Sequence, residues 1–516
     1  MQIEWKTAPA PEWQADALVF FSFEKPGEPL PALGKFLKNS GKWLADSPAL
    51  SDFKGKPSEL VVLYAPGGVG PAPRIILAGL GPVDRFETER LRNASAFALR
   101  KCFELGILRP AIALEALEGF PCAAPNTPPA LEVLLRETLV GAMAGLHQFN
   151  ELKTKNTTVP GCPESLTLLC EKPPETSLRQ TAALAQCEVA GIELARDLTI
   201  SPANRVTPPF LAQAASELAA RFGFSIEIFD IDAARSMGMG AFAAVASGSS
   251  EPARFIVLEH APAGTQNDAP LVFIGKGITF DSGGISLKPA EKMEDMKQDM
   301  AGAAAVLGAF EAIGLAGLSR RVVGILPCTE NMPGGKAYKP GDVLRSYSGR
   351  TVEVISTDAE GRLILCDALA YAAERFKPAL MVDIATLTGS SIIALGRDVA
   401  AVMGTPETLP DAIRKIAASV GERFWPLPLF DFYFEGLKSE VADMKNVAGR
   451  PAGAICAGMF LKQFVPDQIS WVHLDIAGTA WTDKDTGFTP KGATGFGVRT
   501  LFELVKRIRA GESVNG

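Results

Sequence analysis

The sequence predicts a two-domain α/β protein whose larger, C-terminal domain has a mostly parallel central sheet. The chain has 516 residues, more than a single core of about 100 to 200 residues requires. Short β-branched runs alternate with amphipathic stretches of helical period along most of the chain. Such alternation favours a parallel sheet that helices cover on both faces. It is interrupted between about residues 150 and 181, where polar residues and prolines dominate.

The first third of the chain reads as one α/β unit. Apolar runs predict strands, and residues 87–105 and 131–146 have the period of amphipathic helices. We therefore assign residues 1–150 to an N-terminal α/β domain, 151–184 to a linker and 185–516 to the larger domain. The predicted strands of the N-terminal domain are 17–24, 59–66 and 74–81.

Polar residues follow several predicted strands of the larger domain. Ligands of open parallel sheets bind beyond the carboxyl ends of the strands. Lys276 and Asp281 follow the run 270–275, Asp358 and Glu360 follow 351–357, and Thr386 follows the apolar part of 379–387. The other predicted strands are 225–230, 254–260, 321–327 and 471–478.

Composition excludes several classes of protein. A formal charge of −7 has the wrong sign for general contact with phosphate backbones. The N-terminal residues lack a basic segment followed by an apolar one, and we see no apolar run of the roughly 18 residues that span a bilayer. The eight cysteines form no CxxC pair, which is typical of reduced, packing cysteines. We therefore expect a cytoplasmic protein.

Four acidic side chains stand in apolar or glycine-rich surroundings: Asp281 in TFDSGG, Asp299 in KQDMAGAAAV, and Asp358 with Glu360 in STDAEGRL. Each has a simpler interpretation when taken alone. Asp299 precedes an alanine-rich helix and fits an N-cap. Asp358 and Glu360 also precede a helical pattern, where acidic residues favour the positive end of the helix dipole.

Taken together, the four carboxylates predict a metal site, because gathered carboxylates repel one another unless cations neutralise them. Lys276, Lys288 and Arg362 supply part of that charge, and divalent metals would supply the rest. A pair of metals 3.5 to 4 Å apart needs bridging carboxylates, and Asp281 and Glu360 are plausible bridges. Lys276 can be a ligand only as the neutral amine.

Other catalytic motifs fit poorly. GKGITF does not match the GxxxxGK[ST] phosphate loop. A serine hydrolase would use Ser282 and His473, but the GxSxG elbow is absent and His473 lies within an apolar strand, where a core histidine is expected. The run AGAICAGMFLKQF from Ala452 is predicted to be a core helix.

These motifs resemble those of the leucyl aminopeptidases of the M17 group. FIGKGITFDSGGISLKP (273–289) is similar to the first metal motif of that family, and STDAEGRL (356–363) to its octapeptide NTDAEGRL. ENMPGGKAYKPGD and DIATLTGS follow in the expected order. The resemblance covers roughly residues 193–499 and implies a macro-domain-like N-terminal domain joined to a catalytic α/β domain.

The resemblance implies roles for particular residues. One metal ion would be bound by Asp281, Asp358 and Glu360, and a second by Lys276, Asp281, Asp299 and Glu360. Lys288 would stabilise the oxyanion, and Arg362 would hold a bicarbonate that acts as general base toward a metal-bridging water. The pocket for the first side chain would comprise Met296, Thr386, Gly389, Ala477 and Ala480, which suit leucine or other apolar residues.

The resemblance also implies cofactors and partners: two divalent ions per subunit, manganese or zinc, peptide substrates with a free N-terminus, and a homohexamer. Two alternatives remain at this point. A two-metal phosphoesterase usually recruits several histidines, whereas this chain has three and none lies beside the acidic motifs. A DNA-binding regulator is suggested only because some bacterial members of the family bind DNA.

Overall fold

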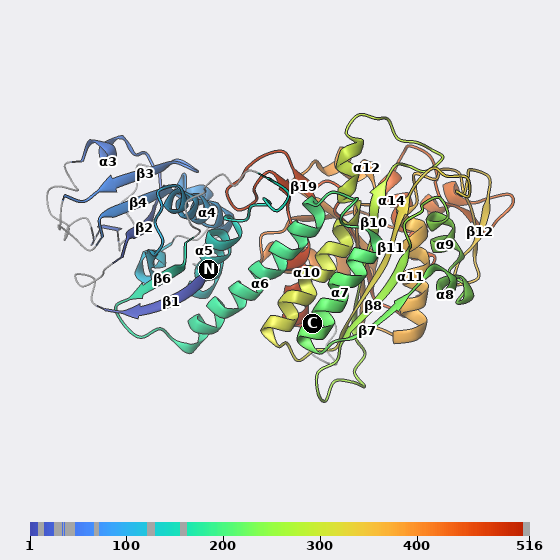
Figure 1. Cartoon of the computed structure of the whole chain (residues 1–516), viewed down its shortest axis with the longest axis horizontal. Helices are drawn as coiled ribbons and strands as arrows, with labels where there is room; N and C mark the ends of the chain where they lie inside the picture. Colours follow the sequence, from blue (N-terminus) through green and yellow to red (C-terminus); the bar gives the residue numbers. More distant parts are fainter. Residues whose placement is uncertain are drawn as a thin grey trace. The chain divides into compact units, whose positions relative to one another are not determined.

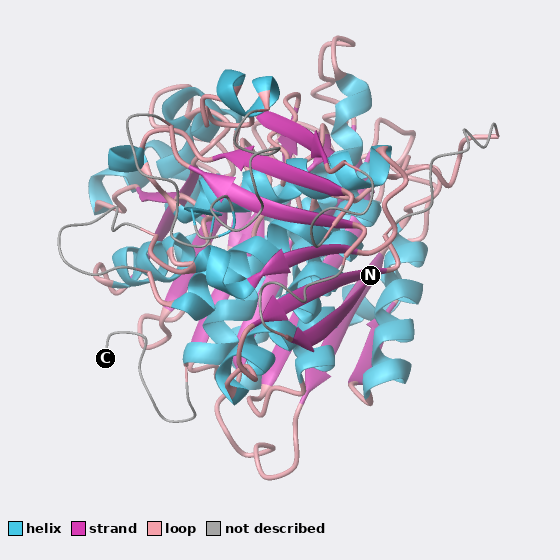
Figure 2. Ribbon diagram, turned by 90° about the vertical axis from the view of Figure 1, so that its left-hand side faces the viewer, coloured by secondary structure: helices cyan, strands magenta, loops and turns pink. Residues whose placement is uncertain are grey.

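The computed structural model describes residues 1–8, 15–24, 33–34, 36, 47–66, 72–120, 129–154 and 163–508. Two compact units are present: Met1–Val189 with Lys484–Pro490, and Ala190–Asp483 with Lys491–Gly516. Helices and strands alternate within each unit (Figures 1 and 2), as the sequence pattern predicts. Cys122 and Cys162 lie outside the described residues. The six described cysteines are free thiols.

The first unit contains a six-stranded sheet in the order β1-β6-β5-β2-β4-β3. All neighbouring strands are parallel except β3 and β4. The strands are β1 (Gln2–Thr7), β2 (Ala17–Ser22), β3 (Leu60–Tyr64), β4 (Arg74–Gly79), β5 (Pro110–Ala113) and β6 (Ser165–Cys170), and the helices are α3 (Pro48–Asp52), α4 (Thr88–Glu104) and α5 (Leu131–Ala144). The three predicted strands and two predicted helices of this region are therefore present.

The segment 151–184, predicted to be a linker, is partly a structural element of the first unit. It contains β6, which pairs with β1 and with β5, and the start of the helix α6 (Thr176–Ile200). The short apolar run of β6 is surrounded by polar residues and prolines, so the local composition did not predict a strand. The strand forms because it pairs with β1 and β5, which are distant in the sequence. The division between the two units falls within α6, after Val189.

The second unit is built on a nine-stranded sheet in the order β16-β15-β18-β14-β9-β11-β8-β7, with β10 paired to β11. Its centre is parallel, whereas β8 pairs antiparallel with both β7 and β11, and β15 pairs antiparallel with β18 and parallel with β16. The strands are β7 (Ser225–Phe229), β8 (Arg254–His260), β9 (Leu271–Gly275), β10 (Gly277–Asp281), β11 (Val322–Asn331), β14 (Leu380–Ala385), β15 (Ala400–Thr405), β16 (Phe424–Pro426) and β18 (Trp471–Asp475).

Helices cover both faces of this sheet. Figure 1 shows α7 (Pro208–Phe222) and α10 (Ala301–Ala316) on one side and α9 (Gly240–Ala246) and α11 (Gly361–Phe376) on the other. The central strands are buried on both faces, which explains their continuous apolar sequences. The remaining helices are α8 (Ile231–Ser236), α12 (Gly389–Leu395), α13 (Leu409–Ala418), α14 (Gly453–Lys462) and α15 (Val498–Arg507).

One predicted strand of the large sheet is elsewhere. Of residues 351–357, only β13 (Thr351–Glu353) is a strand, and it joins a separate three-stranded sheet with β12 (Val343–Arg345) and β17 (Met444–Lys445). The polar residues that follow it therefore approach the large sheet from a loop that leads into α11.

A single helical stretch among the described residues, Met293–Ala316, is long and apolar enough to span a membrane by length and composition. The sequence analysis expected no such stretch. Within its 18-residue window 83% is buried inside the protein, so this stretch packs as a core helix of the second unit.

Candidate active site

Lys276 lies between two strands at the carboxyl end of the sheet. Its backbone N–H donates to the Ile384 carbonyl of β14 at 3.0 Å, and its own carbonyl accepts from Ala303 N of α10 at 2.9 Å. Only 3% of Lys276 is exposed. A Cβ on Gly361 would lie 2.6 Å from the Lys276 Cε atom. The glycine of STDAEGRL therefore leaves the space that the lysine side chain occupies.

The turn after β10 joins the two main motifs. Gly283 and Gly284 have φ values of +89° and +68°, a region that glycine adopts without steric cost. Ser286 N donates to Thr357 Oγ1 at 2.8 Å, and Thr357 N donates to Ser286 Oγ at 3.1 Å. This reciprocal pair connects the DSGG turn to the octapeptide and places Lys288 against Asp358.

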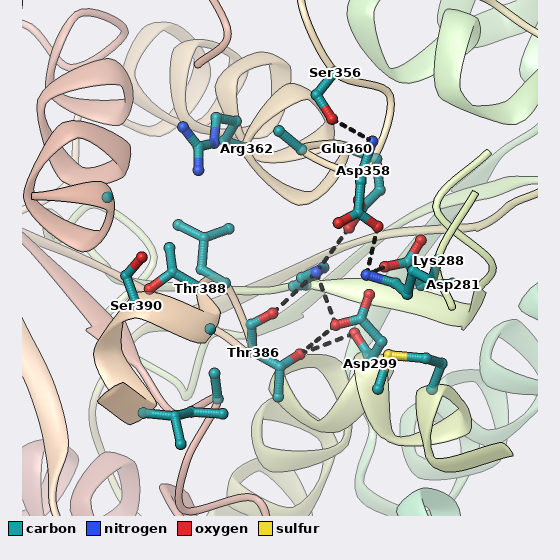
Figure 3. A pocket seen from close by; sticks show the side chains of 18 of the residues that line it. Asp281, Lys288, Asp299, Ser356, Asp358, Glu360, Arg362, Thr386, Thr388 and Ser390 are labelled. Carbon is teal, nitrogen blue, oxygen red and sulfur yellow. Dashed lines mark hydrogen bonds and ion pairs between the residues drawn. The ribbon is translucent and has the colours of Figure 1, made fainter. Parts of the chain in front are cut away.

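Two lysines and four carboxylates form two groups of ion pairs, one around each lysine (Figure 3). Lys276 Nζ lies 2.8 Å from Asp299 Oδ1 and 2.8 Å from Glu360 Oε1. Lys288 Nζ lies 2.8 Å from Asp281 Oδ2 and 2.5 Å from Asp358 Oδ1. The structure thus brings together six residues that the sequence placed in three separate segments.

Three of the carboxylates are close enough to share a metal ion. Asp281, Asp358 and Glu360 each offer a ligand atom, and these atoms all lie within 4.8 Å of one another. Carboxylate oxygens are ligands for divalent cations such as manganese, magnesium and zinc. The donor set therefore fits a divalent metal ion.

Asp299 is not the N-cap that its sequence position also suggested. The N-cap of α10 is Met300, and it makes no side-chain capping bond. Asp299 Oδ1 instead accepts from Lys276 Nζ and from Thr386 Oγ1, both at 2.8 Å. Its Oδ2 atom is buried with no hydrogen-bond partner. A buried carboxylate oxygen without a donor is costly, and a metal ion would satisfy it.

Burial and mutual charge shift the pKa values of these groups. Burial, with further contributions from nearby carboxylates, raises the pKa of Glu360 and raises that of Asp299 well above its ordinary value. Burial disfavours the ammonium forms of Lys276 and Lys288, yet the surrounding carboxylates outweigh it and raise both lysine pKa values. The site therefore has a strong requirement for positive charge.

Arg362 occupies the first turn of α11. Its Nη1 donates to the Asn446 carbonyl at 2.7 Å, and its Nε is buried without a hydrogen-bond partner. Burial lowers the pKa of Arg362 to about 10. The guanidinium lines the same cavity as the carboxylates and thus has a donor available for an anion.

The cavity over these residues has a volume of about 440 Å³, within the range of small-molecule sites. Met296, Thr386, Gly389 and Ala477 line it, as the resemblance implied. Ala480 is only 2% exposed and is not among the lining residues, whereas its neighbour Trp481 is. Cys456 of α14 also lines the cavity, so the predicted core helix contributes one side chain to the site.

Sequence reasoning did not identify Asn331, at the end of β11. Its Nδ2 donates to Asp281 Oδ1 at 2.8 Å and to the Thr357 carbonyl at 2.9 Å, and lies 3.4 Å from Glu360 Oε2. Asn331 is completely buried. Its place at the end of a strand, within the quoted motif ENMPGGKAYKPGD, was the signal that could have revealed it.

The geometry does not support a serine hydrolase at this position. Ser282 Oγ donates to the Asn331 carbonyl at 2.7 Å. His473 is fully buried in β18, and its Nδ1 lies 2.5 Å from Asp383 Oδ1. The interpretation of His473 as a core residue is therefore confirmed.

The fold and the site define a class: an α/β protein with a carboxylate-rich centre at the strand ends, of the kind that metal-dependent hydrolases use. Residues 193–502 match the catalytic domain of the cytosol aminopeptidase family, and residues 18–156 match its N-terminal domain. The chain belongs to the cytosol aminopeptidase family, whose activity is metal-dependent removal of residues from peptide N-termini.

Relatives and solved structures agree with this assignment. A "Probable cytosol aminopeptidase" of Syntrophobacter fumaroxidans is 56% identical over 504 residues, 98% of each chain. One of the same description from Nitratidesulfovibrio vulgaris is 47% identical, over 98% of this chain and 99% of the relative. The structure of a tomato leucine aminopeptidase mutant is 33% identical in sequence and superposes with a TM-score of 0.85, over 98% of this chain and 97% of the tomato chain. The structure of the bottromycin maturation enzyme BotP in complex with Mn is 31% identical and superposes with a TM-score of 0.81, over 95% of this chain and 99% of the BotP chain.

Proposed function

We propose that this protein is a dinuclear metallo-aminopeptidase that releases leucine and other apolar residues from peptides with a free N-terminus. The observation that carries the proposal is the set of four carboxylates paired with two lysines, in which Asp281, Asp299 and Glu360 are buried and Asp299 Oδ2 has no donor. The residues proposed to hold two divalent ions, manganese or zinc, are Lys276, Asp281, Asp299, Asp358 and Glu360.

When bound, the two ions would supply Lewis acidity and an activated bridging water. Lys276 would join them as the neutral amine, so metal binding would be coupled to loss of its proton. Asn331 holds Asp281 in place by its amide group. Thr386 likewise fixes Asp299 through its hydroxyl.

Lys288 is proposed to donate a hydrogen bond to the oxyanion that develops on the scissile carbonyl. Its side chain is 22% exposed, so the ammonium is accessible from the cavity while two carboxylates hold it. Arg362 is proposed to bind bicarbonate as the general base, because its Nε has no protein partner. Met296, Thr386, Gly389 and Ala477 are proposed to surround the first side chain, and Ala480 to pack behind them as part of the cavity wall.

The first test is hydrolysis of leucine p-nitroanilide after chelation and after manganese or zinc is restored. We expect cleavage only with metal, and none of the N-acetylated analogue. Lys288→Ala should lower kcat by roughly 10²-fold, the usual effect of losing one oxyanion donor. Lys336→Ala, at an exposed lysine outside the cavity, is the matched control. Absence of cleavage with every metal would contradict the proposal.

Assembly and location complete the proposal. We propose a homohexamer in the cytoplasm, supported by the family membership and by the relatives' description as cytosol aminopeptidases. Light scattering coupled to size-exclusion chromatography tests the assembly. A mass of one or two subunits would contradict it.

A further inference from the structure

The cavity wall contains an aromatic residue where the sequence suggested a small one. The segment 477–481 approaches the site after β18, and Ala480 was expected to face the first side chain of the substrate. Ala480 is buried, and its N–H donates to the Ile476 carbonyl at 3.0 Å. The next residue, Trp481, is half-buried and lines the cavity together with Met296 and Ala477.

Backbone pairing fixes the position of Trp481. It lies in β19 (Trp481–Thr482), where it pairs with Ala493 of β20 (Gly492–Ala493). Thr494 strengthens this connection, since its N–H donates to the Ala480 carbonyl at 3.1 Å and its hydroxyl to the Thr479 carbonyl at 2.7 Å. The backbone of Trp481 is thus held by the pairing of two short strands at the wall of the cavity.

A lysine supports the ring from the protein side. Lys297 Nζ lies 5.5 Å from the centroid of the Trp481 ring and donates to the Ile200 carbonyl at 2.7 Å. A cation at this distance attracts the face of an indole. Lys297 does not itself line the cavity. It therefore stabilises the ring orientation without presenting its charge to the substrate.

The surroundings of Trp481 fit an apolar ligand. Met296, on the same 3-10 helix as Lys297 (Met293–Met300), adds a thioether to this side of the cavity. Outside the ion pairs of the carboxylate cluster, the cavity is also lined by three cationic side chains, Lys292, Arg362 and Arg397, and by two acidic ones, Asp295 and Asp483. Both signs of charge are therefore present in the lining.

We infer that Trp481 is a specificity-determining residue, whose ring selects peptides with a large apolar or aromatic first residue: phenylalanine, tryptophan, methionine or leucine over alanine. This inference rests on the proposed function, because it assigns the first side chain to the Met296 and Ala477 side of the cavity. The ring would contact that side chain by offset or edge-to-face packing.

The test is a comparison of kcat/KM for phenylalanine, leucine, alanine, lysine and glutamate p-nitroanilides. We expect wild type to prefer phenylalanine and leucine. Trp481→Ala should lower kcat/KM for phenylalanine about tenfold or more, mainly through a higher KM, because hydrophobic pockets discriminate by such factors. The alanine substrate should change less than about twofold. Trp481→Phe should retain most of the preference, because it keeps an aromatic face.

Controls separate selectivity from folding. Trp425→Ala removes a tryptophan that is 58% exposed and outside the cavity, and we expect its substrate order to match wild type. If Trp481→Ala fails to fold, Trp481→Leu replaces the ring while keeping bulk, and the same loss for phenylalanine is expected. An equal loss for all substrates would overturn the inference alone, and a wild-type preference for lysine or glutamate would overturn both the inference and the proposed preference for apolar residues. No turnover of any substrate with manganese or zinc would overturn the proposed function and this inference together.

Discussion

Asn331 offers a direct test of whether the carboxylate cluster is a metal centre. The side chain is not among those that line the cavity, yet its amide donates to Asp281 and to the Thr357 carbonyl. Asn331→Ala removes both bonds from a completely buried site. We expect the variant to fold, to bind manganese more weakly, and to recover most of its turnover when manganese is raised.

The magnitude follows from the bonds lost. A hydrogen bond to a charged group contributes about 1.5 to 3 kcal/mol, and a neutral one about 1 kcal/mol. Loss of both predicts a decrease of roughly 2 to 4 kcal/mol in the free energy of unfolding. Loss of a partner that orients a metal ligand typically weakens metal affinity by about 10 to 100-fold. Asn331→Asp should weaken it too, because a carboxylate cannot donate to Asp281 and would repel it.

The assay measures leucine p-nitroanilide hydrolysis against free manganese, together with urea unfolding of the metal-free protein. Asn204→Ala, at an exposed asparagine outside the cavity, is the control. The reasoning would be refuted if Asn331→Ala reached half-maximal activity at the same manganese concentration as wild type, since the amide would then have no role in orienting a ligand.

Four further predictions follow from the site and its surroundings. Asp358→Ala should abolish turnover while circular dichroism stays unchanged, and near-normal activity would exclude it as a ligand. Arg362→Ala should reduce kcat less than Asp358→Ala does, with partial recovery on adding bicarbonate; complete loss without recovery would argue against an anion site. Burial raises the pKa of the Cys456 thiol, so iodoacetamide should inactivate the enzyme slowly at pH 7 and faster at pH 9. The Cys456→Ala variant should keep its activity under the same treatment. An inactivation rate that does not change with pH would contradict this prediction. Burial raises the pKa of Asp367 to about 7, above about 3.9 in the unfolded chain. The folded state then retains a proton that the unfolded chain has lost, so the free energy of unfolding should fall between about pH 4 and 7, and Asp367→Asn should remove that slope in urea titrations.

Much of the second unit could be predicted because its local patterns are strong. The buried strands β9, β14 and β18 have mostly apolar sequences, and each was predicted within three residues of its observed ends. β13 was misplaced for a physical reason. Its alternating sequence fits any half-buried strand, and only pairing with β12 and β17 assigns it to the small sheet.

The charged residue types of the candidate site could also be predicted, since four carboxylates in apolar surroundings require cations. The role of Asp299, as the N-cap of α10 or as a partner of Lys276, could not be predicted. That choice depends on Lys276 and Thr386, which lie 23 and 87 residues away in the chain and reach Asp299 Oδ1 only because β9 and β14 are adjacent. Asn331 was missed for the same reason, because an asparagine at a strand end has no local signature of its partners.

The sequence by itself determined the α/β class, the family resemblance that the comparisons confirm, and the set of charged residues proposed to carry the chemistry. These features depend on local periodicity and on residue identity, and both can be obtained from the sequence without the structure. The tertiary structure alone decided which carboxylates lie close together, that β6 belongs to the first sheet, and that Trp481 rather than Ala480 lines the cavity. Such features depend on strand pairing and on the direction of side chains after a turn. Successive residues of a strand point to opposite faces, so a shift of one position separates a residue in the core from a residue on the cavity wall.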